Sequence, residues 1–322
     1  MNPLRRALLG TAALALAMAA HAQGSYPSQP IRIIVPFPPG GPADALARVV
    51  SNKLAPLLGQ PVLVDNRAGA GGTLGVNLVA KSRPDGYTLV LVGPGPLVVL
   101  PSVARLPYDP LRDLQPITQL VTAPMVVLTS GASRFNSLGD VIKAARARPG
   151  TLNYASSGAG NSNHIASELL KRETGIDMQH VPYKGAGTAL TALMAGDTEV
   201  GILDMPGLPA QLQGGRLKAL AVTSAQRSPM LPEVPTTAEA GYPSVQATSW
   251  FGLFAAAQTP REVVMKLNRS VVSVLKEPDV QEAVTKLGAQ IVAGSPEAFE
   301  AFVRSEAGRW GPIAVSVGIR LE

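Results

Sequence analysis

Two glycine-rich segments lie where a strand is expected to end and a helix to begin. The first covers residues 36–44 and the second covers residues 155–164. The first N–H groups of a helix lack acceptors within the helix, and the helix dipole adds about half a positive charge there. Such an end binds anions without help from an arginine or a lysine. The chemistry that these two segments predict is therefore the binding of an anion such as a carboxylate.

The pattern of these segments alone allows two interpretations. Ser156, Ser157 and Ser162 add hydroxyl donors to the second segment. If the segments belong to different lobes, they could face one another across a cleft and hold a single carboxylate between them. Alternatively, both are ordinary strand-to-helix connections of an α/β sheet, in which glycine and serine only shape the turn. The residues themselves leave both interpretations open.

Other kinds of site find little support. The chain has no cysteine, which excludes disulfides, thiolate metal sites and a cysteine nucleophile. His164 and His180 are the histidines beyond residue 22, and neither belongs to an H-E-x-x-H motif, so we expect no metal and no cofactor. A serine hydrolase that uses Ser157 and His164 is a weak alternative, because the segment lacks G-x-S-x-G. We therefore expect no catalytic residues.

The stretches around these segments predict the elements that position them. Leu46, Val50 and Leu54 recur at helical spacing and predict a helix over 43–58, and a second helix is expected over 164–173. Apolar or β-branched runs predict strands at 31–35, 62–64, 88–92, 126–128, 152–155, 200–203 and 219–223. Strands that alternate with helices indicate mostly parallel sheets covered on both faces.

The first 22 residues have the pattern of a secretory signal peptide. Arg5 and Arg6 precede an apolar run over 7–20, which ends in Ala20-His21-Ala22. We expect cleavage after Ala22, export by the general route rather than the twin-arginine route, and a periplasmic protein. Loss of the two arginines lowers the net charge from +6 to +4. Because the basic residues are scattered, we expect no nucleic-acid partner.

Several sequence motifs resemble those of one known family. Residues 26–37 read YPSQPIRIIVPF and are followed by Gly40-Gly41. This opening resembles the Bug family, the periplasmic solute receptors of tripartite tricarboxylate transporters. Further matching stretches follow in order at 65–72, 84–89, 106–110, 152–158, 180–185, 220–223, 234–236 and 250–253. The resemblance covers essentially the whole chain after residue 22.

The resemblance implies a fold and a function. The implied fold is α/β, a two-lobed periplasmic binding protein type II fold in which each lobe is a mostly parallel sheet flanked by helices. We expect lobe 1 to comprise 23–124 and 248–322, and lobe 2 to comprise 125–247. The implied function is to capture a small carboxylate between the lobes and deliver it to integral-membrane permease subunits, with the receptor acting as a monomer.

Mono- and dicarboxylates, amino acids and aromatic acids are all candidate ligands. The low aromatic content, 4%, favours a small acid over a sugar, since sugar sites usually rely on aromatic faces. An exported protein that acts on a membrane sensor would share the same pocket and is the main alternative to a transport receptor.

The resemblance also assigns the site residue by residue. One carboxylate of the ligand is expected to lie between the loop after the first strand and the serine–glycine loop of the second lobe, with an acidic residue after the strand 200–203 nearby. The candidate ligand-binding residues are Phe37, Gly40, Gly41, Pro42, Ala43, Asp44, Ser156, Ser157, Gly158, Gly160, Asn161, Ser162, His164 and Asp204.

Two departures from the family pattern affect the expected ligand. Ala43 stands where the family usually has threonine or serine, which removes a hydroxyl donor but leaves the backbone donors. After the third strand the family often presents serine or threonine, whereas this chain has Gly-Pro-Gly-Pro at 93–96. The second change removes polar contacts and predicts a more apolar ligand than a typical relative would take.

Overall fold

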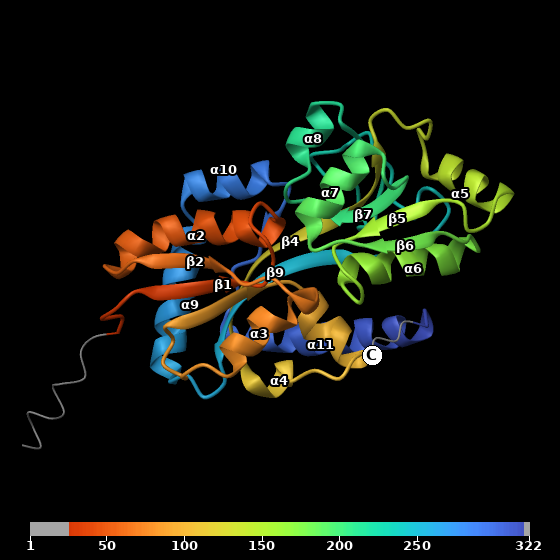
Figure 1. Cartoon of the computed structure of the whole chain (residues 1–322). Coiled ribbons are helices and arrows are strands. Elements are labelled where there is room, and N and C mark those ends of the chain that lie inside the picture. Colours follow the sequence, from red (N-terminus) through yellow and green to blue (C-terminus); the bar gives the residue numbers. More distant parts are fainter. Residues whose placement is uncertain (1–25, 319–322) are drawn as a thin grey trace, which may run out of the picture.

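Two α/β lobes lie side by side, and two strands run between them (Figure 1). The computed structural model describes residues 26–318. The expected signal peptide and its cleavage site after Ala22 lie outside the described residues. Each helix within 26–318 is too short or too polar to cross a membrane. The α/β fold predicted from the sequence is confirmed.

The first lobe is built from the beginning and the end of the chain. From the beginning it takes β1 (Ile31–Val35), α2 (Pro42–Leu58), β2 (Val62–Asn66), η1 (Ala70–Gly72), α3 (Thr73–Ala80), β3 (Thr88–Val92), η2 (Gly95–Val99), η3 (Leu100–Ser102) and α4 (Pro110–Asp113). From the end it takes α9 (Arg261–Leu275), α10 (Pro278–Lys286), β10 (Gln290–Ile291) and α11 (Pro296–Ser316). Strands β2, β1 and β3 are adjacent and parallel.

The second lobe repeats this arrangement with the middle of the chain. It contains α5 (Leu138–Ala147), β5 (Asn153–Ser156), α6 (Ser162–Thr174), β6 (Gln179–Pro182), α7 (Ala186–Ala195), β7 (Val200–Asp204), α8 (Pro209–Gln213) and β8 (Leu217–Val222). Here β7, β5 and β6 are adjacent and parallel. The α2 and α6 helices therefore begin at equivalent places, each after the carboxyl end of a parallel strand.

Strands β4 (Leu114–Ser130) and β9 (Thr248–Ala256) connect the lobes. The first part of β4 pairs antiparallel with β9 as far as Pro124, and from Met125 onward β4 pairs with β7 and β8. This change of partners supports the lobe limits that we propose, 23–124 with 248–322 and 125–247. Both sheets are mixed. The predicted parallel pairing holds for β2, β1 and β3 and for β7, β5 and β6, whereas β4, β8, β9 and β10 pair antiparallel with their neighbours.

The sheets are covered on both faces, as the runs of apolar strand residues predicted. Ile31, Ile33 and Val35 of β1 pack in one buried cluster with α2 and α9, whereas Ile34 belongs to the cluster on the opposite face. Alternate residues of a strand point to opposite faces, so β1 is buried on both sides. This burial fixes the strand ends from which the glycine-rich loops emerge.

Helix α11 is anchored at the junction between the lobes. The buried carboxylate of Glu306 accepts hydrogen bonds from Trp250 Nε1 at 3.0 Å and from Trp310 Nε1 at 2.9 Å. Since Trp250 lies on β9, this contact ties α11 to a connecting strand. The far end of α11 reaches α6 of the second lobe (Figure 1).

Candidate functional site

A cavity of about 300 Å³ lies between the lobes, a volume suited to a small ligand. From lobe 1 it is lined by residues 37–43 and 93–96, and from β9 by Ser249 and Phe251. Lobe 2 contributes Ser157, Asn161, Ser162, Lys184, Ala186, Gly187, Thr188, Thr191 and Asp204. The cavity therefore opens onto the N-termini of both α2 and α6.

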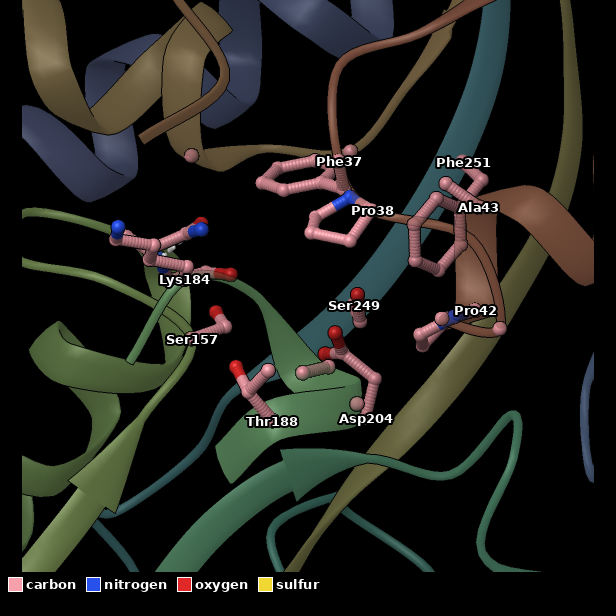
Figure 2. Close-up of a pocket in the computed structure, with 18 of the residues that line it drawn as sticks. Phe37, Pro38, Pro42, Ala43, Ser157, Lys184, Thr188, Asp204, Ser249 and Phe251 are labelled. Atoms are coloured by element: carbon pink, nitrogen blue, oxygen red, sulfur yellow. Dashed lines mark hydrogen bonds between the residues drawn. The ribbon is translucent and has the colours of Figure 1, made fainter. Parts of the chain in front are cut away.

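The lobe 1 wall presents backbone rather than polar side chains to the cavity. Gly41 is the N-cap of α2 and makes no side-chain cap, and Pro42 follows at the first helical position. Proline lacks an N–H, but the other N–H groups of the first turn have no acceptor within the helix. In Figure 2, Phe37, Pro42 and Ala43 line this side of the cavity. The wall is thus apolar except for its backbone donors.

Asp44 stabilises this loop by hydrogen bonds without lining the cavity. Its carboxylate accepts hydrogen bonds from Gly40 N, Asn66 Nδ2 and Arg48 Nε, each at 3.0 Å. Burial alone would raise the pKa of Asp44, but the hydrogen bonds from Arg48, Gly40 and Asn66 outweigh burial and lower this pKa. The carboxylate therefore stays ionised and fixes the turn before α2.

The lobe 2 wall is made of polar side chains. Asn161 caps α6, and its Oδ1 accepts a hydrogen bond from Ser162 N at 2.9 Å. The hydroxyl of Ser157 donates to Asn163 Oδ1, and Asn163 Nδ2 donates to Asp204 Oδ1 at 3.4 Å. A chain of hydrogen bonds thus runs from the beginning of α6 to the carboxyl group at the end of β7.

A stack of buried rings supports this wall. The His164 and His180 rings lie 3.8 Å apart and nearly parallel, and the Tyr154 ring stacks on His180. Burial, together with the neighbouring histidine and Lys171, lowers the pKa of His164 to about 3. Burial also lowers the pKa of His180 to about 4. Neutral His164 accepts a hydrogen bond at Nδ1 from Gly160 N at 3.0 Å, which fixes the loop before α6.

This arrangement does not pair Ser157 with His164. The Ser157 hydroxyl donates to Asn163, while Nδ1 of His164 is occupied by Gly160 N. Ser156 instead forms the contact with a histidine, 2.6 Å from His180 Nε2. A nucleophile needs a base within hydrogen-bond reach, and Ser157 faces an amide.

Asp204 and Ser249 form the floor of the cavity (Figure 2). Burial raises the pKa of Asp204 to about 6, and the neighbouring Ser249 hydroxyl and Asn163 amide offset only part of this effect. The Ser249 hydroxyl is fully buried and makes no well-formed hydrogen bond to any residue within 26–318. The floor therefore combines a buried carboxyl group with the buried hydroxyl beside it.

The predicted site residues fall into two sets. One set lines the cavity: Phe37, Gly40, Gly41, Pro42, Ala43, Ser157, Asn161, Ser162 and Asp204. The other set comprises Asp44, Ser156, Gly160 and His164, which hold the loops by the hydrogen bonds given above, and Gly158, which lines a neighbouring cavity between the lobes. A direct role in binding remains a prediction for all of them.

Five polar or aromatic residues that line the cavity were not predicted from the sequence: Lys184, Thr188, Thr191, Ser249 and Phe251. Lys184 follows β6, and the carboxyl ends of parallel strands meet at the same edge of a sheet, so its place could have been inferred. Ser249 and Phe251 lie on β9 just past the expected crossing near residue 247. The antiparallel pairing of β9 with β3 and β4 brings them to the cavity.

The lobes touch beside the cavity. A methyl group on Gly95 would lie 2.0 Å from Asn161 Oδ1, and one on Gly185 would lie 3.0 Å from Pro38 Cδ. Each pair joins residues of different lobes, so the glycines allow an approach that a side chain would prevent. The structure therefore has the lobes closed against one another.

Comparison with known proteins gives one consistent result. The family model described as "Tripartite tricarboxylate transporter family receptor" matches residues 46–319. The chain is 39% identical over 300 residues to the protein BugT of Bordetella pertussis, covering 92% of each chain.

Solved structures give the same picture. The periplasmic binding protein BugD is 32% identical with a TM-score of 0.88, over 92% of this chain and 100% of BugD. An R. palustris protein solved with adipate is 34% identical with a TM-score of 0.89, over 92% of this chain and 99% of that chain. MatC from Rhodopseudomonas palustris, solved with malate, is 33% identical with a TM-score of 0.86, over 90% of this chain and 100% of MatC.

Proposed function

The chain belongs to the tripartite tricarboxylate transporter receptor family, and we propose that its own ligand is a small carboxylate held in the cavity between the lobes. It is a solute-binding receptor of a transport system rather than an enzyme. Relatives solved with adipate and with malate support a carboxylate, and the chemistry of the cavity supports it independently.

The observation that carries this proposal is that two helix N-termini from different lobes open onto one cavity. The α2 end offers backbone N–H groups, and the α6 end adds the side chains of Ser157 and Ser162. Hydrogen bonds to a charged partner contribute about 1.5–3 kcal/mol each. A carboxylate in this position stabilises the closed arrangement because both lobes bind it.

The connecting strands suggest how the receptor opens. Within residues 26–318 the chain passes between the lobes inside β4 near Pro124 and again at the beginning of β9 near Thr248, so small changes in the backbone at these two places would separate the lobes. Closure removes water from the cavity and strengthens the hydrogen bonds to the ligand. The receptor acts in the periplasm as a monomer, after cleavage of the signal peptide behind Ala22. In its closed state it delivers the ligand to integral-membrane permease subunits.

A thermal-shift series tests the ligand class. The protein, first unfolded and refolded to remove bound ligand, is heated with mono-, di- and tricarboxylates, amino acids, aromatic acids and sugars. A ligand at 100 times its dissociation constant adds about 2.7 kcal/mol and a clear rise in Tm. A rise confined to carboxylates is expected. A rise in Tm with sugars alone, or no rise with any of the acids, would contradict the proposal.

A further inference from the structure

The segment just before β9 is held on the lobe 2 side of the crossing. Thr223 follows β8, and its hydroxyl donates a hydrogen bond to the carbonyl oxygen of Ala247 at 2.6 Å. The backbone N–H of Ala247 in turn donates to the carbonyl oxygen of Thr223 at 3.0 Å. Residues 246 and 247 therefore move with lobe 2, directly before the strand that enters lobe 1.

On the other side of the crossing, Trp250 of β9 is held by α11. Its Nε1 donates to Glu306 Oε2 at 3.0 Å, and its ring meets the Phe299 ring edge to face, with 5.7 Å between the ring centroids. Trp250 stands between Ser249 and Phe251, which line the cavity. Helix α11 therefore fixes the part of β9 that carries these two cavity residues.

The side chain of Arg309 joins the two sides of the crossing. Arg309 lies one turn after Glu306 on α11 and forms an ion pair with it, with 3.0 Å between Nη1 and Oε1. Its Nη2 donates to the carbonyl oxygen of Gln246 at 3.2 Å, and its guanidinium lies over the Trp310 ring, 5.1 Å from the ring centroid. One guanidinium thus connects a helix of lobe 1 to the last residues of lobe 2 before β9.

This connection leaves little freedom for the lobes to rotate. The Glu306 carboxylate accepts hydrogen bonds from two tryptophan side chains as well as from Arg309, so it cannot follow the guanidinium. A guanidinium donates in fixed directions, and N–H···O hydrogen bonds extend to about 3.2 Å, the length of the bond to Gln246. A rotation of the lobes at Thr248 would therefore break this bond.

We propose that Glu306 and Arg309 form a hinge clamp, which stabilises the closed arrangement of the lobes through Gln246 and is released when the lobes open. Both are positioning residues, since neither lines the cavity and each acts on the ligand only through closure. This inference rests on the proposed function in one respect, namely that a carboxylate binds while the lobes are closed.

A second contact between the lobes lies further along α11. Arg172 of α6 donates through Nη1 to the hydroxyl of Ser316, the last residue of α11. Arg172 also forms an ion pair with Glu173 on its own helix. Helix α11 therefore reaches lobe 2 at two places, and we expect Ser316→Ala to act in the same direction as loss of the clamp but more weakly.

Calorimetric titration of Arg309→Ala tests the clamp. When only the closed state binds, the affinity is proportional to the fraction of closed receptor. Loss of a hydrogen bond that exists only in the closed state should therefore weaken the binding of succinate, glutarate and benzoate by one common factor, about threefold to tenfold. Unequal factors for the three acids would mean that Arg309 acts on the ligand site itself and would contradict the clamp.

Arg304→Ala is the matched control. Arg304 also lies on α11 and forms an ion pair at 2.9 Å with Glu300 one turn earlier, and within residues 26–318 its side-chain hydrogen bonds go to Glu300 alone. This variant loses the same kind of ion pair from the same helix without touching lobe 2, so its affinities should equal those of the wild type. Equal weakening in Arg304→Ala and Arg309→Ala would reduce the effect to helix stability and overturn the clamp.

Glu306→Gln tests whether the two residues act as one unit. The glutamine oxygen can still accept from the tryptophans, but the charged partner of Arg309 is lost. We expect the same loss of affinity as in Arg309→Ala, and no further loss when the two substitutions are combined. Additive losses would show that Glu306 and Arg309 act independently and would contradict the clamp.

Hydrogen–deuterium exchange without added acid separates this inference from the proposed function. Peptides that cover residues 245–250 should exchange severalfold faster in Arg309→Ala than in the wild type, and at the wild-type rate in Arg304→Ala, because the clamp restrains this segment. If none of the acids binds to the wild type but exchange changes in this way, the carboxylate proposal fails and the clamp stands. Unchanged exchange in Arg309→Ala would overturn the clamp whatever the acids do.

Discussion

The two glycine-rich loops at the cavity each lead from a strand to a helix but are built differently. In the lobe 1 loop, residues 36–44, the helix begins without a side-chain cap, and the one carboxylate of the turn points backward to hold it. In the lobe 2 loop, residues 155–164, an asparagine caps the helix and serine and asparagine side chains form a hydrogen-bonded wall. The lobe 1 loop presents backbone N–H groups to the cavity, whereas the lobe 2 loop presents polar side chains.

This difference suggests a division of roles. Backbone N–H groups at the beginning of α2 can hold any carboxylate, because they read charge rather than shape. The polar wall of α6, which leads through Asn163 to Asp204, can distinguish ligands by their other groups. Lobe 1 would then supply general anion binding, and lobe 2 would supply selectivity.

The largest effect is expected from the lobe 2 loop. Ser157 is 6% exposed and lines the cavity, so in Ser157→Leu a larger apolar side chain would occupy the anion site. We expect no measurable binding by calorimetry, with a circular dichroism spectrum unchanged from the wild type. Ser157→Ala, which removes only the hydroxyl, should weaken binding about tenfold. A folded Ser157→Leu protein with unchanged affinity would show that the pocket is wrongly assigned.

The contact between the lobes can be broken without touching either loop. In Gly95→Ala the new methyl group would meet Asn161 across the cavity, so the closed arrangement is blocked while lobe 1 keeps its fold. We expect binding about 100-fold weaker and a larger radius of gyration with ligand by X-ray scattering. Gly308→Ala, which has open space around it on α11, is the control. Wild-type affinity in Gly95→Ala would contradict the closed state as the binding state.

The lobe 1 loop should respond more mildly. Asp44→Ala removes the acceptor for Gly40 N, Asn66 and Arg48, which loosens the turn before α2 but leaves its N–H groups in place. We expect carboxylates to bind about tenfold more weakly, with the ranking among ligands unchanged. A changed ranking, measured by titration with three or more acids, would mean that lobe 1 also determines selectivity.

The smallest effect is on stability in acid. The pKa values of His164 and His180 are lowered to about 3 and about 4. The unfolded chain therefore takes up these protons at higher pH, and unfolding becomes easier as the pH falls from about 6.5 toward 4. Asp204 has a raised pKa of about 6 and acts in the opposite direction, since its protonation favours the folded state.

Urea unfolding between pH 7 and pH 4 separates these contributions. His180→Phe keeps a ring against Tyr154 and removes one titrating group, so its stability should fall less with acid than that of the wild type, by about 1–2 kcal/mol. In Asp204→Asn the loss should be steeper than in the wild type. Identical pH profiles of stability for the wild type and His180→Phe would contradict the conclusion that folding lowers the pKa of His180.

Much of this account follows from sequence pattern. Strands with continuous apolar runs, such as 31–35 and 88–92, were predicted at their observed limits because parallel strands are buried on both faces. The helices after the glycine-rich loops were predicted within about two residues, the first of them because its apolar residues recur at helical spacing directly after the turn. Local pattern was sufficient where the interactions are local.

The parts that were missed depend on distant pairing. Only three residues of the 17-residue β4 were predicted as a strand, because Pro116 and Pro124 interrupt its pattern and its partners come from both lobes. Ser249 reaches the cavity only through its pairing with Ala123. Residues such as Asp44 and His164, which are predicted to contact the ligand, also hold the loops in place through hydrogen bonds, and spacing alone does not reveal this second role.

The most direct test of the account is a crystal structure with a carboxylate that binds in the thermal-shift series. We predict that the oxygen atoms of one carboxylate group accept hydrogen bonds both from backbone N–H groups of residues 41, 43 and 44 and from residues 157–163, so that the two lobes share one anion. A carboxylate held by a single lobe, or bound at Lys184 on the rim of the cavity, would contradict this central claim.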